Sequence, residues 1–279
     1  MSHFSVLVIG NNPKASLAPY HEFECTGIND EYILEIDISE EIRGDIENQG
    51  SIEEAIIYNL GDDCIISDES ELDLNDQHKF GYAIVRGGEL IKAVRRTNPN
   101  KQWDWYVLGG RWSGFLLHKN GDRVDTIKKG DLDIEGAIAQ KAIDAKRSHE
   151  AFMSAIAGHE LPSAWSAVRE EFENIDEARE VYNAQPAIKA IKGSAVARIF
   201  GGEVEYYGID EQLFVSSQVD STFSTYAIIY ENKWLSKGEM GWWGCSTDNM
   251  SQGEWDKLVN ELINKLPDDT LLSVYDCHI

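Results

Sequence analysis

The sequence predicts an α+β fold with a mixed or antiparallel sheet, in which both chain ends are core strands and a helical subdomain is inserted. Apolar, β-branched runs lie near both ends, at Phe4–Ile9 and Leu271–Tyr275, and an alanine-rich stretch without proline fills Ile134–Ala157. A strand that is apolar on both faces needs a sheet to bury it, so both ends are expected in one sheet. The expected domains are one α+β core made of 1–130 together with 200–279, and a helical insertion at 131–199.

The first eighty residues contain one further strand and one helix. Tyr32–Ile38 alternates apolar and polar residues, which predicts a strand with Tyr32, Leu34, Ile36 and Ile38 on one face. Ser51, followed by two glutamates, is typical of a helix N-cap and predicts a helix over Ile52–Leu60. The acidic stretch Asp62–Gln77 has no clear pattern and is expected to form a loop.

Three hairpins are expected between residues 80 and 127, forming an antiparallel meander. The first joins Gly81–Val85 to Glu89–Val94. The second joins the runs WDWYVL and GFLLH around GGRWS. The third turns at Asn120-Gly121, a dipeptide that favours two-residue hairpin turns.

The second half of the chain alternates between helical and strand patterns. A helix is expected to start at Leu161-Pro162, to run past Tyr182 and to be broken by Pro186. The other expected elements are a return to strand at Ser194–Gly208, a strand at Thr225–Tyr230 with a turn at Asn232, and an amphipathic helix at Gly253–Leu266.

The formal net charge is −24 at pH 7 and is unevenly distributed. Between Tyr20 and Phe80 there are nineteen Asp and Glu residues but only two basic residues, Arg43 and Lys79, so this segment carries −17. An acidic field repels phosphate backbones, so direct nucleic-acid binding is not expected. Two interpretations stay open: a solvated surface, or an acidic face that meets a basic partner.

Composition also bounds the class of protein. A hydrophobic content of 42% excludes global disorder. Since there is no run of about 18 apolar residues and no signal-peptide pattern, we expect a cytoplasmic protein without a membrane span. The four cysteines are widely spaced and are expected to be reduced thiols. Common nucleotide-binding, nucleophile and metal motifs are missing, so neither a cofactor nor a metal is expected.

The last four residues, Asp276–Ile279 (DCHI), are the best ionisable cluster in the sequence. A thiol and an imidazole can form a reactive ion pair or bind a metal. Adjacent residues of a strand, however, point to opposite faces, so Cys277 and His278 are not expected in one pocket without a bulge. A structural role at the chain end and a catalytic role both stay open. Glu239, Cys245 or His3 could join the cluster, since the terminal strands are candidates to be neighbours.

Two tryptophan-rich clusters raise the question of a binding surface. Strand alternation places Trp103 and Trp105 on one face, with Asp104 and Tyr106 on the other. The two interpretations are a core scaffold and a stacking surface, to which Arg111 adds a planar cation after a glycine turn. The candidate ligand- or partner-binding residues are Trp103, Trp105, Tyr106, Gly109, Gly110, Arg111, Trp112, Glu239, Trp242, Trp243 and His278.

Several blocks of the chain resemble a family of bacteriophage-encoded proteins. They are MSHFSVLVIG, LAPYHEFECTG, WDWYVLGGRWSGF followed by KKGDLD, GEMGWWG and LPDDTLLSVYDCHI. The resemblance covers about half of the chain; the acidic segment 28–80 and the helical span 134–222 do not match. It supplies no catalytic residue, so what it implies is a biological context.

That context, together with the charge, implies a phage accessory protein in the host cell cytoplasm that inhibits bacterial antiviral defence by binding. The expected partner is a host defence protein, whose basic groove the acidic surface masks, or a nucleotide signal sequestered by the Trp/Arg/Gly residues. The alternative is a hydrolase or transferase acting on a small molecule or nucleotide, with a site near Arg111, Glu239, Cys277 and His278. A structural virion protein is a third hypothesis, and homo-oligomerisation is left open.

Overall fold

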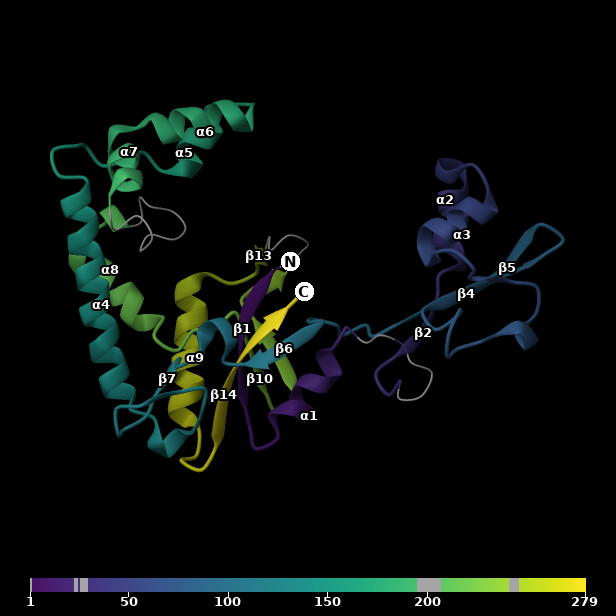
Figure 1. The fold of residues 1–279 in the computed structure, drawn as a ribbon, viewed down its shortest axis with the longest axis horizontal. Helices are drawn as coiled ribbons and strands as arrows, with labels where there is room; N and C mark the ends of the chain where they lie inside the picture. Colours follow the sequence, from purple (N-terminus) through teal and green to yellow (C-terminus); the bar gives the residue numbers. More distant parts are fainter. Residues whose placement is uncertain (1, 23–24, 26–29, 195–206, 241–245) are drawn as a thin grey trace. The chain divides into compact units, whose positions relative to one another are not determined.

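The computed structural model describes residues 2–22, 25, 30–194, 207–240 and 246–279 and has the α+β fold with mixed sheets that the sequence predicts (Figure 1). The chain divides into two compact units: unit 1 comprises 1–113, 226–247 and 272–279, and unit 2 comprises 114–225 and 248–271. These boundaries differ from the expected division at 130 and 200. Within the described residues, no helix has both the length and the apolar character needed to cross a bilayer.

The core sheet of unit 1 joins the two ends of the chain. Its strands lie in the order β11-β10-β1-β14-β6, with β1 parallel to β10 and antiparallel to β14. The N and C labels of Figure 1 lie side by side for this reason. Both ends are thus core strands, as predicted. The strands are β1 (His3–Ile9), β6 (Trp105–Leu108), β10 (Ala227–Tyr230), β11 (Lys233–Ser236) and β14 (Leu271–His278).

One face of this sheet is packed into a hydrophobic core. Alternate residues of β1 point to this face because successive side chains of a strand lie on opposite sides. The short helix α1 (Pro13–Leu17) adds Leu17, and the ring of Tyr106 meets that of Trp103 edge to face at 4.8 Å between centroids. The buried members are Phe4, Val6, Val8, Leu17, Trp103, Ala227, Ile229, Tyr275 and Cys277.

A second sheet of unit 1, in the order β2-β5-β4-β3, packs with two helices, α2 and α3. Ile42 and Ile56 face Ala83 and Ala93 in a separate hydrophobic cluster. Ser51 caps α3 by accepting a hydrogen bond from the Glu54 amide at 3.1 Å, as predicted. The elements are β2 (Leu34–Asp37), α2 (Ser39–Gln49), α3 (Ile52–Leu60), β3 (Ile65–Ile66), β4 (Gly81–Arg86) and β5 (Glu89–Thr97).

Unit 2 is mainly helical. Phe152 and Ile156 near the end of α4 pack with Ala187 and Ile191 of α7. Its elements are β7 (Leu116–Leu117), β8 (Arg123–Val124), β9 (Thr126–Lys128), α4 (Ile134–Ala155), α5 (Trp165–Glu170), α6 (Ile175–Ala184), α7 (Pro186–Gly193), α8 (Glu211–Asp220) and α9 (Gln252–Lys265). Two short strands complete the described chain, β12 (Gly238–Met240) and β13 (Ser246–Asp248).

Two strand predictions are wrong in their pairing or burial. The runs WDWYVL and GFLLH do not form a hairpin: β6 pairs with β14, and β7 pairs with β8 around the predicted Asn120-Gly121 turn. The long strand β14 offers β6 four partners from a distant part of the chain, and local spacing does not reveal this. The strand predicted at Tyr32–Ile38 is shortened to β2, an edge strand whose four residues are all exposed.

The helix predicted from Leu161 to Pro186 is divided. α5 ends at Glu170, and α6 begins anew with the Asn174 side chain accepting a hydrogen bond from the Asp176 amide. Pro186 does not end the helical region. It occupies the first position of α7, where a backbone N–H would have no partner within the helix, so its absence breaks no helical hydrogen bond. The strand expected at Ser194–Gly208 lies largely outside the described residues. The helices α2 and α8 were not predicted.

Because Trp103 is 5% exposed within the core, we expect Trp103→Ala to lower the free energy of unfolding by about 3–5 kcal/mol. The matched control is Trp105→Ala, which removes the same side chain from a site that is 45% exposed and should cost about 1 kcal/mol or less. Urea denaturation followed by circular dichroism measures both values. Equal losses in the two variants would contradict the placement of Trp103 in the core.

Candidate functional site

Three aromatic rings align across neighbouring strands at one end of the core sheet. His3 of β1 lies opposite His278 of β14, and His278 lies opposite Trp105 of β6. The imidazole centroids are 5.1 Å apart, and the indole stacks on His278 at 5.8 Å with an interplanar angle of 16°. Together with Asp104 and Asp276, these residues form what we call the paired-histidine cluster.

The first histidine is held by a buried carboxylate. His3 Nδ1 lies 2.8 Å from Asp276 Oδ1, and the Arg111 backbone N–H donates to Asp276 Oδ2 at 3.0 Å. Asp276 is only 2% exposed. A buried carboxylate needs such partners, because burying an oxygen without a hydrogen bond raises the free energy of the folded state. The two bonds therefore fix both the carboxylate and the ring of His3.

The second histidine is held by the half-exposed carboxylate of Asp104, which directly precedes strand β6. His278 Nδ1 lies 2.7 Å from Asp104 Oδ1, and the Trp105 amide donates to the same oxygen at 2.6 Å. The Asp104 amide in turn donates to the His278 carbonyl at 2.9 Å. The backbone thus positions Asp104 directly beside the imidazole that it orients.

These bonds define the state of each imidazole ring. An ionised carboxylate can only accept a hydrogen bond, so Nδ1 carries a proton in both rings. The Nε2 atom of each ring then holds a lone pair when the imidazole is neutral and a proton when it is charged. Neither Nε2 has a hydrogen-bond partner within the described part of the chain. The cluster therefore contains two imidazole nitrogens without a hydrogen-bond partner among the described residues, one on the partly exposed His3 and one on His278, which is 5% exposed.

The glycine pair that precedes Arg111 is explained by a close approach to Asp276. Gly109 and Gly110 have φ values of 71° and 53°, a region that favours glycine. A Cβ on Gly110 would lie 2.5 Å from Asp276 Oδ2 and 2.8 Å from Val107 Cγ1. The absence of a side chain lets the turn bring the Arg111 amide to the buried carboxylate.

Two of the candidate residues from the sequence, Trp105 and His278, belong to this cluster, and Gly110 and Arg111 of the adjoining turn lie against its Asp276. Arg111 contributes through its backbone, and its side chain is exposed. Trp103 and Tyr106 lie instead on the opposite face, in the core. The expected shared face of Trp103 and Trp105 is therefore wrong, because the chain bends at Asp104 and β6 begins only at Trp105.

Cys277 takes no part in the cluster. It points away from His278 into the core, as the alternation of strand residues predicts. Burial, and secondarily the neighbouring Asp276 carboxylate, raises the pKa of the Cys277 thiol far above its usual range. The thiol is therefore protonated at neutral pH. The reactive thiolate–imidazolium pair that the sequence leaves open is not formed.

The remaining candidates are placed in part. Gly109 donates its amide to the Val274 carbonyl at 2.9 Å, and Trp112 is half-buried at the end of the 3-10 turn. Glu239 lies in β12. Trp242 and Trp243 lie outside the described residues.

Three members of the cluster are absent from the candidate set derived from the sequence: His3, Asp104 and Asp276. Asp276 nevertheless belongs to the DCHI cluster that the sequence singles out, and His3 is a neighbour expected there if the terminal strands pair, as they do. The bend at Asp104 left no sequence signal that we recognised. Within the described residues, no group of three or more His, Cys, Asp and Glu side chains is arranged to hold a metal ion.

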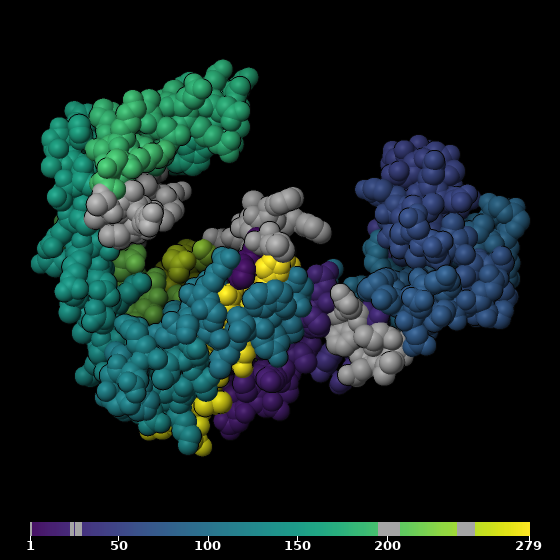
Figure 2. Space-filling model, viewed as in Figure 1, coloured from purple at the N-terminus to yellow at the C-terminus, as the bar shows by residue number. Residues whose placement is uncertain are grey.

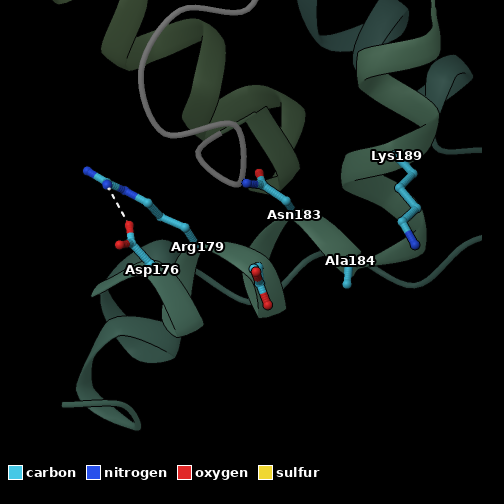
Figure 3. Close-up of a pocket in the computed structure, with 6 residues that line it drawn as sticks. Asp176, Arg179, Asn183, Ala184 and Lys189 are labelled. Carbon is cyan, nitrogen blue, oxygen red and sulfur yellow. Dashed lines mark hydrogen bonds and ion pairs between the residues drawn. The ribbon is translucent and has the colours of Figure 1, made fainter. Parts of the chain in front are cut away.

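A groove of about 600 Å³ lies on α6 and α7 of unit 2 (Figure 3). Asp176 and Arg179 form an ion pair at 3.1 Å on its wall. The side chains of Arg179 and Lys189 extend in different directions in Figure 3. A specific small-molecule site needs polar groups that converge, so this groove is a weaker candidate than the paired-histidine cluster.

A second candidate surface, which we call the acidic surface, comprises the exposed carboxylates between Glu31 and Asp76 in unit 1. The helices α2 and α3, dark blue in Figure 2, carry several of them. Arg43 is the single Arg or Lys of this segment. The fifteen carboxylates belong to Glu31, Glu35, Asp37, Glu40, Glu41, Glu47, Glu53, Glu54, Asp62, Asp63, Asp68, Glu69, Glu71, Asp73 and Asp76.

We expect Gly110→Ala to lower the free energy of unfolding by about 2–4 kcal/mol, because the new methyl group overlaps Asp276 as well as straining the backbone. Gly121→Ala is the matched control: Gly121 also has a positive φ, 92°, but nothing lies within 4 Å of its Cβ position, so about 1 kcal/mol is expected. Chemical denaturation compares the two. An equal cost at both positions would argue against the close approach of Gly110 to Asp276.

Comparisons with protein-family models, with curated proteins and with solved structures found no match.

Proposed function

We propose that the chain is a bacteriophage accessory protein that acts in the host cytoplasm by binding, and that its acidic surface masks the basic groove of a host antiviral defence protein. The observation that carries this proposal is the excess of exposed carboxylates in unit 1: fifteen carboxylates against one arginine between Glu31 and Asp76. The resemblance of several sequence blocks to bacteriophage proteins supplies the biological context.

Most of this charge is not neutralised within the chain. Four of the fifteen carboxylates form ion pairs with arginines, those of Glu35, Glu40, Glu41 and Asp68. The other eleven form none among the described residues. Uncompensated charge of one sign attracts a partner of the opposite sign over about a Debye length and speeds their association. A groove that binds nucleic acid is a surface of the required sign.

The acidic surface also offers apolar contact area. On α3, Tyr58 is 69% exposed and Ile57 is 38% exposed, in the same helix as the glutamates Glu53 and Glu54. Interfaces combine such buried aromatic anchors with a polar rim, and tyrosine is enriched among the residues that dominate binding energy. Tyr58 is therefore our candidate anchor in this interface.

A second form of the binding function uses the paired-histidine cluster to sequester a nucleotide signal. The specific observation in its favour is Trp105, whose indole is 45% exposed beside two imidazoles. An exposed indole provides a stacking face for a nucleobase, and a protonated imidazole can bond a phosphate oxygen.

We expect the triple variant Glu47→Lys, Glu53→Lys and Asp62→Lys to lose the ability to inhibit host defence. These carboxylates have no ion pair among the described residues, so reversing them removes attraction without breaking an ion pair of the fold. Glu53 lies in the first turn of α3, so circular dichroism first establishes that the variant is folded. The chain is expressed in bacteria that each carry one defence system, and the plating of a sensitive phage is counted. The unaltered chain should restore plating against at least one system, and the triple variant should not.

The control is Glu170→Lys, Glu173→Lys and Glu180→Lys, which makes the same change in net charge on exposed residues of unit 2. This variant should restore plating as the unaltered chain does. With the purified target, the first triple variant should associate on the order of tenfold more slowly at low salt. Equal inhibition by both triple variants would remove the acidic surface from the mechanism, and failure of the unaltered chain against every system would refute the function.

A further inference from the structure

We propose that the paired-histidine cluster is a catalytic site that hydrolyses a phosphodiester bond of a small nucleotide by general acid–base catalysis. This inference does not depend on the acidic surface. It rests on the second form of the proposed function, in which the paired-histidine cluster binds a nucleotide. The inference adds that the bound nucleotide is cleaved.

The geometry provides two proton-transfer groups at one place. Each Nδ1 is anchored to a carboxylate of its own, His3 to Asp276 and His278 to Asp104, at 2.8 and 2.7 Å. The ring centroids lie 5.1 Å apart, with an interplanar angle of 75°. Both Nε2 atoms, which have no hydrogen-bond partner among the described residues, are thus held by the fold, and general acid–base catalysis requires positioned groups of this kind. A single histidine with one carboxylate is common in structural roles; two such pairs in ring contact are harder to explain by stability alone.

The described residues around the cluster favour water as the nucleophile. The Cys277 thiol lies on the other face of β14 and is protonated. Ser5 lies on the same face as Asp276, and its Oγ accepts a hydrogen bond from the Tyr226 amide at 3.2 Å, which ties it to the neighbouring strand region. The proposal therefore assigns the attack on phosphorus to an activated water.

The proposed reaction is balanced without an oxidant, a reductant or a cofactor. A neutral Nε2 accepts a proton from water while the water oxygen forms a bond to phosphorus. The protonated Nε2 of the other imidazole donates its proton to the departing ester oxygen as that P–O bond breaks. Water and a phosphodiester give a phosphomonoester and an alcohol, and exchange with solvent restores the two imidazoles.

The substrate class follows from the indole and from the charge of the protein. Trp105 offers an exposed face on which a nucleobase can stack next to the two imidazoles. A net charge of −24 repels a long polyanion such as RNA or DNA. A small diester with one or two phosphates, such as a cyclic mononucleotide or a cyclic dinucleotide, carries little charge and is the class that fits.

The experiment incubates the purified full chain with a panel of cyclic mononucleotides and cyclic dinucleotides in the presence of EDTA, and mass spectrometry detects the linear or monoester products. At least one probe should be converted. His3→Gln and His278→Gln should each slow conversion by about 100-fold or more. The control His159→Ala removes an exposed histidine of unit 2 and should leave the rate unchanged.

Two further measurements separate chemistry from positioning and binding. Trp105→Ala should raise KM more than it lowers kcat, because stacking acts on the bound nucleobase. Asp104→Asn should lower kcat and alter the dependence of kcat on pH, because Asp104 acts through the ring of His278 as a positioning residue. The rate should follow a bell-shaped pH profile, since one imidazole must be neutral and the other protonated. Among the described residues, the titratable groups that face the two imidazoles are Asp104, Asp276 and the imidazoles themselves.

Thermal melting and circular dichroism establish that each variant is folded, and only folded variants are compared. Binding of a probe that is released unaltered would overturn the catalytic inference while leaving sequestration in place. Neither binding nor conversion of any probe would overturn both, and the plating result for the acidic surface would stand independently. Full activity of folded His3→Gln or His278→Gln, or conversion that appears only after EDTA is replaced by a divalent metal, would also overturn the acid–base assignment.

Discussion

The antiparallel pairing of β1 with β14 is the interaction on which unit 1 depends. It joins seven residue pairs, from His3 with His278 to Ile9 with Leu272, and places the two ends of the chain side by side in the middle of the core sheet. The hydrophobic core on one face takes members from both strands, and the cluster on the other face takes both of its histidines from them. Closing a loop of this length carries an entropic cost that only the burial of apolar side chains can offset.

The same pairing accounts for the different character of the two faces at this end of the sheet. Cys277, with its raised pKa, faces the core, and its neighbours Asp276 and His278 face the other way. A polar residue is tolerated within a buried strand when its partners are in place, as they are for Asp276, which receives one hydrogen bond from a side chain and one from a backbone amide. The cluster is thus a set of polar groups that the fold supports with specific partners.

Local signals in the sequence predicted local structure well. Ser51 as a cap, Asn120-Gly121 and Asn232 as turns, and the apolar runs at both ends all recur in the structure. What local patterns could not supply was the choice of distant partners. β6 pairs with β14, a strand that lies far from it in the sequence. The bend at Asp104 places Trp103 and Trp105 on opposite faces of the sheet. For the site, the strand alternation was enough to separate Cys277 from His278, and the expected pairing of the terminal strands already suggested His3, but Asp104 enters only through the long-range register of β6 and β14.

The arrangement of β1 and β14 also has a mechanical consequence. Because the strands are antiparallel neighbours, residues 3 and 278 lie at the same end of the pair, and Ser2 and Ile279 exchange backbone hydrogen bonds beyond them. A force applied to the two termini would peel the strands apart one bond at a time, and not shear all the bonds at once. The Ser2–Ile279 bonds would open first and the rung that carries the two histidines next, because the ends of a strand pair open before the sheet interior. Such a force would therefore dismantle the paired-histidine cluster before it opened the rest of the β1–β14 pairing.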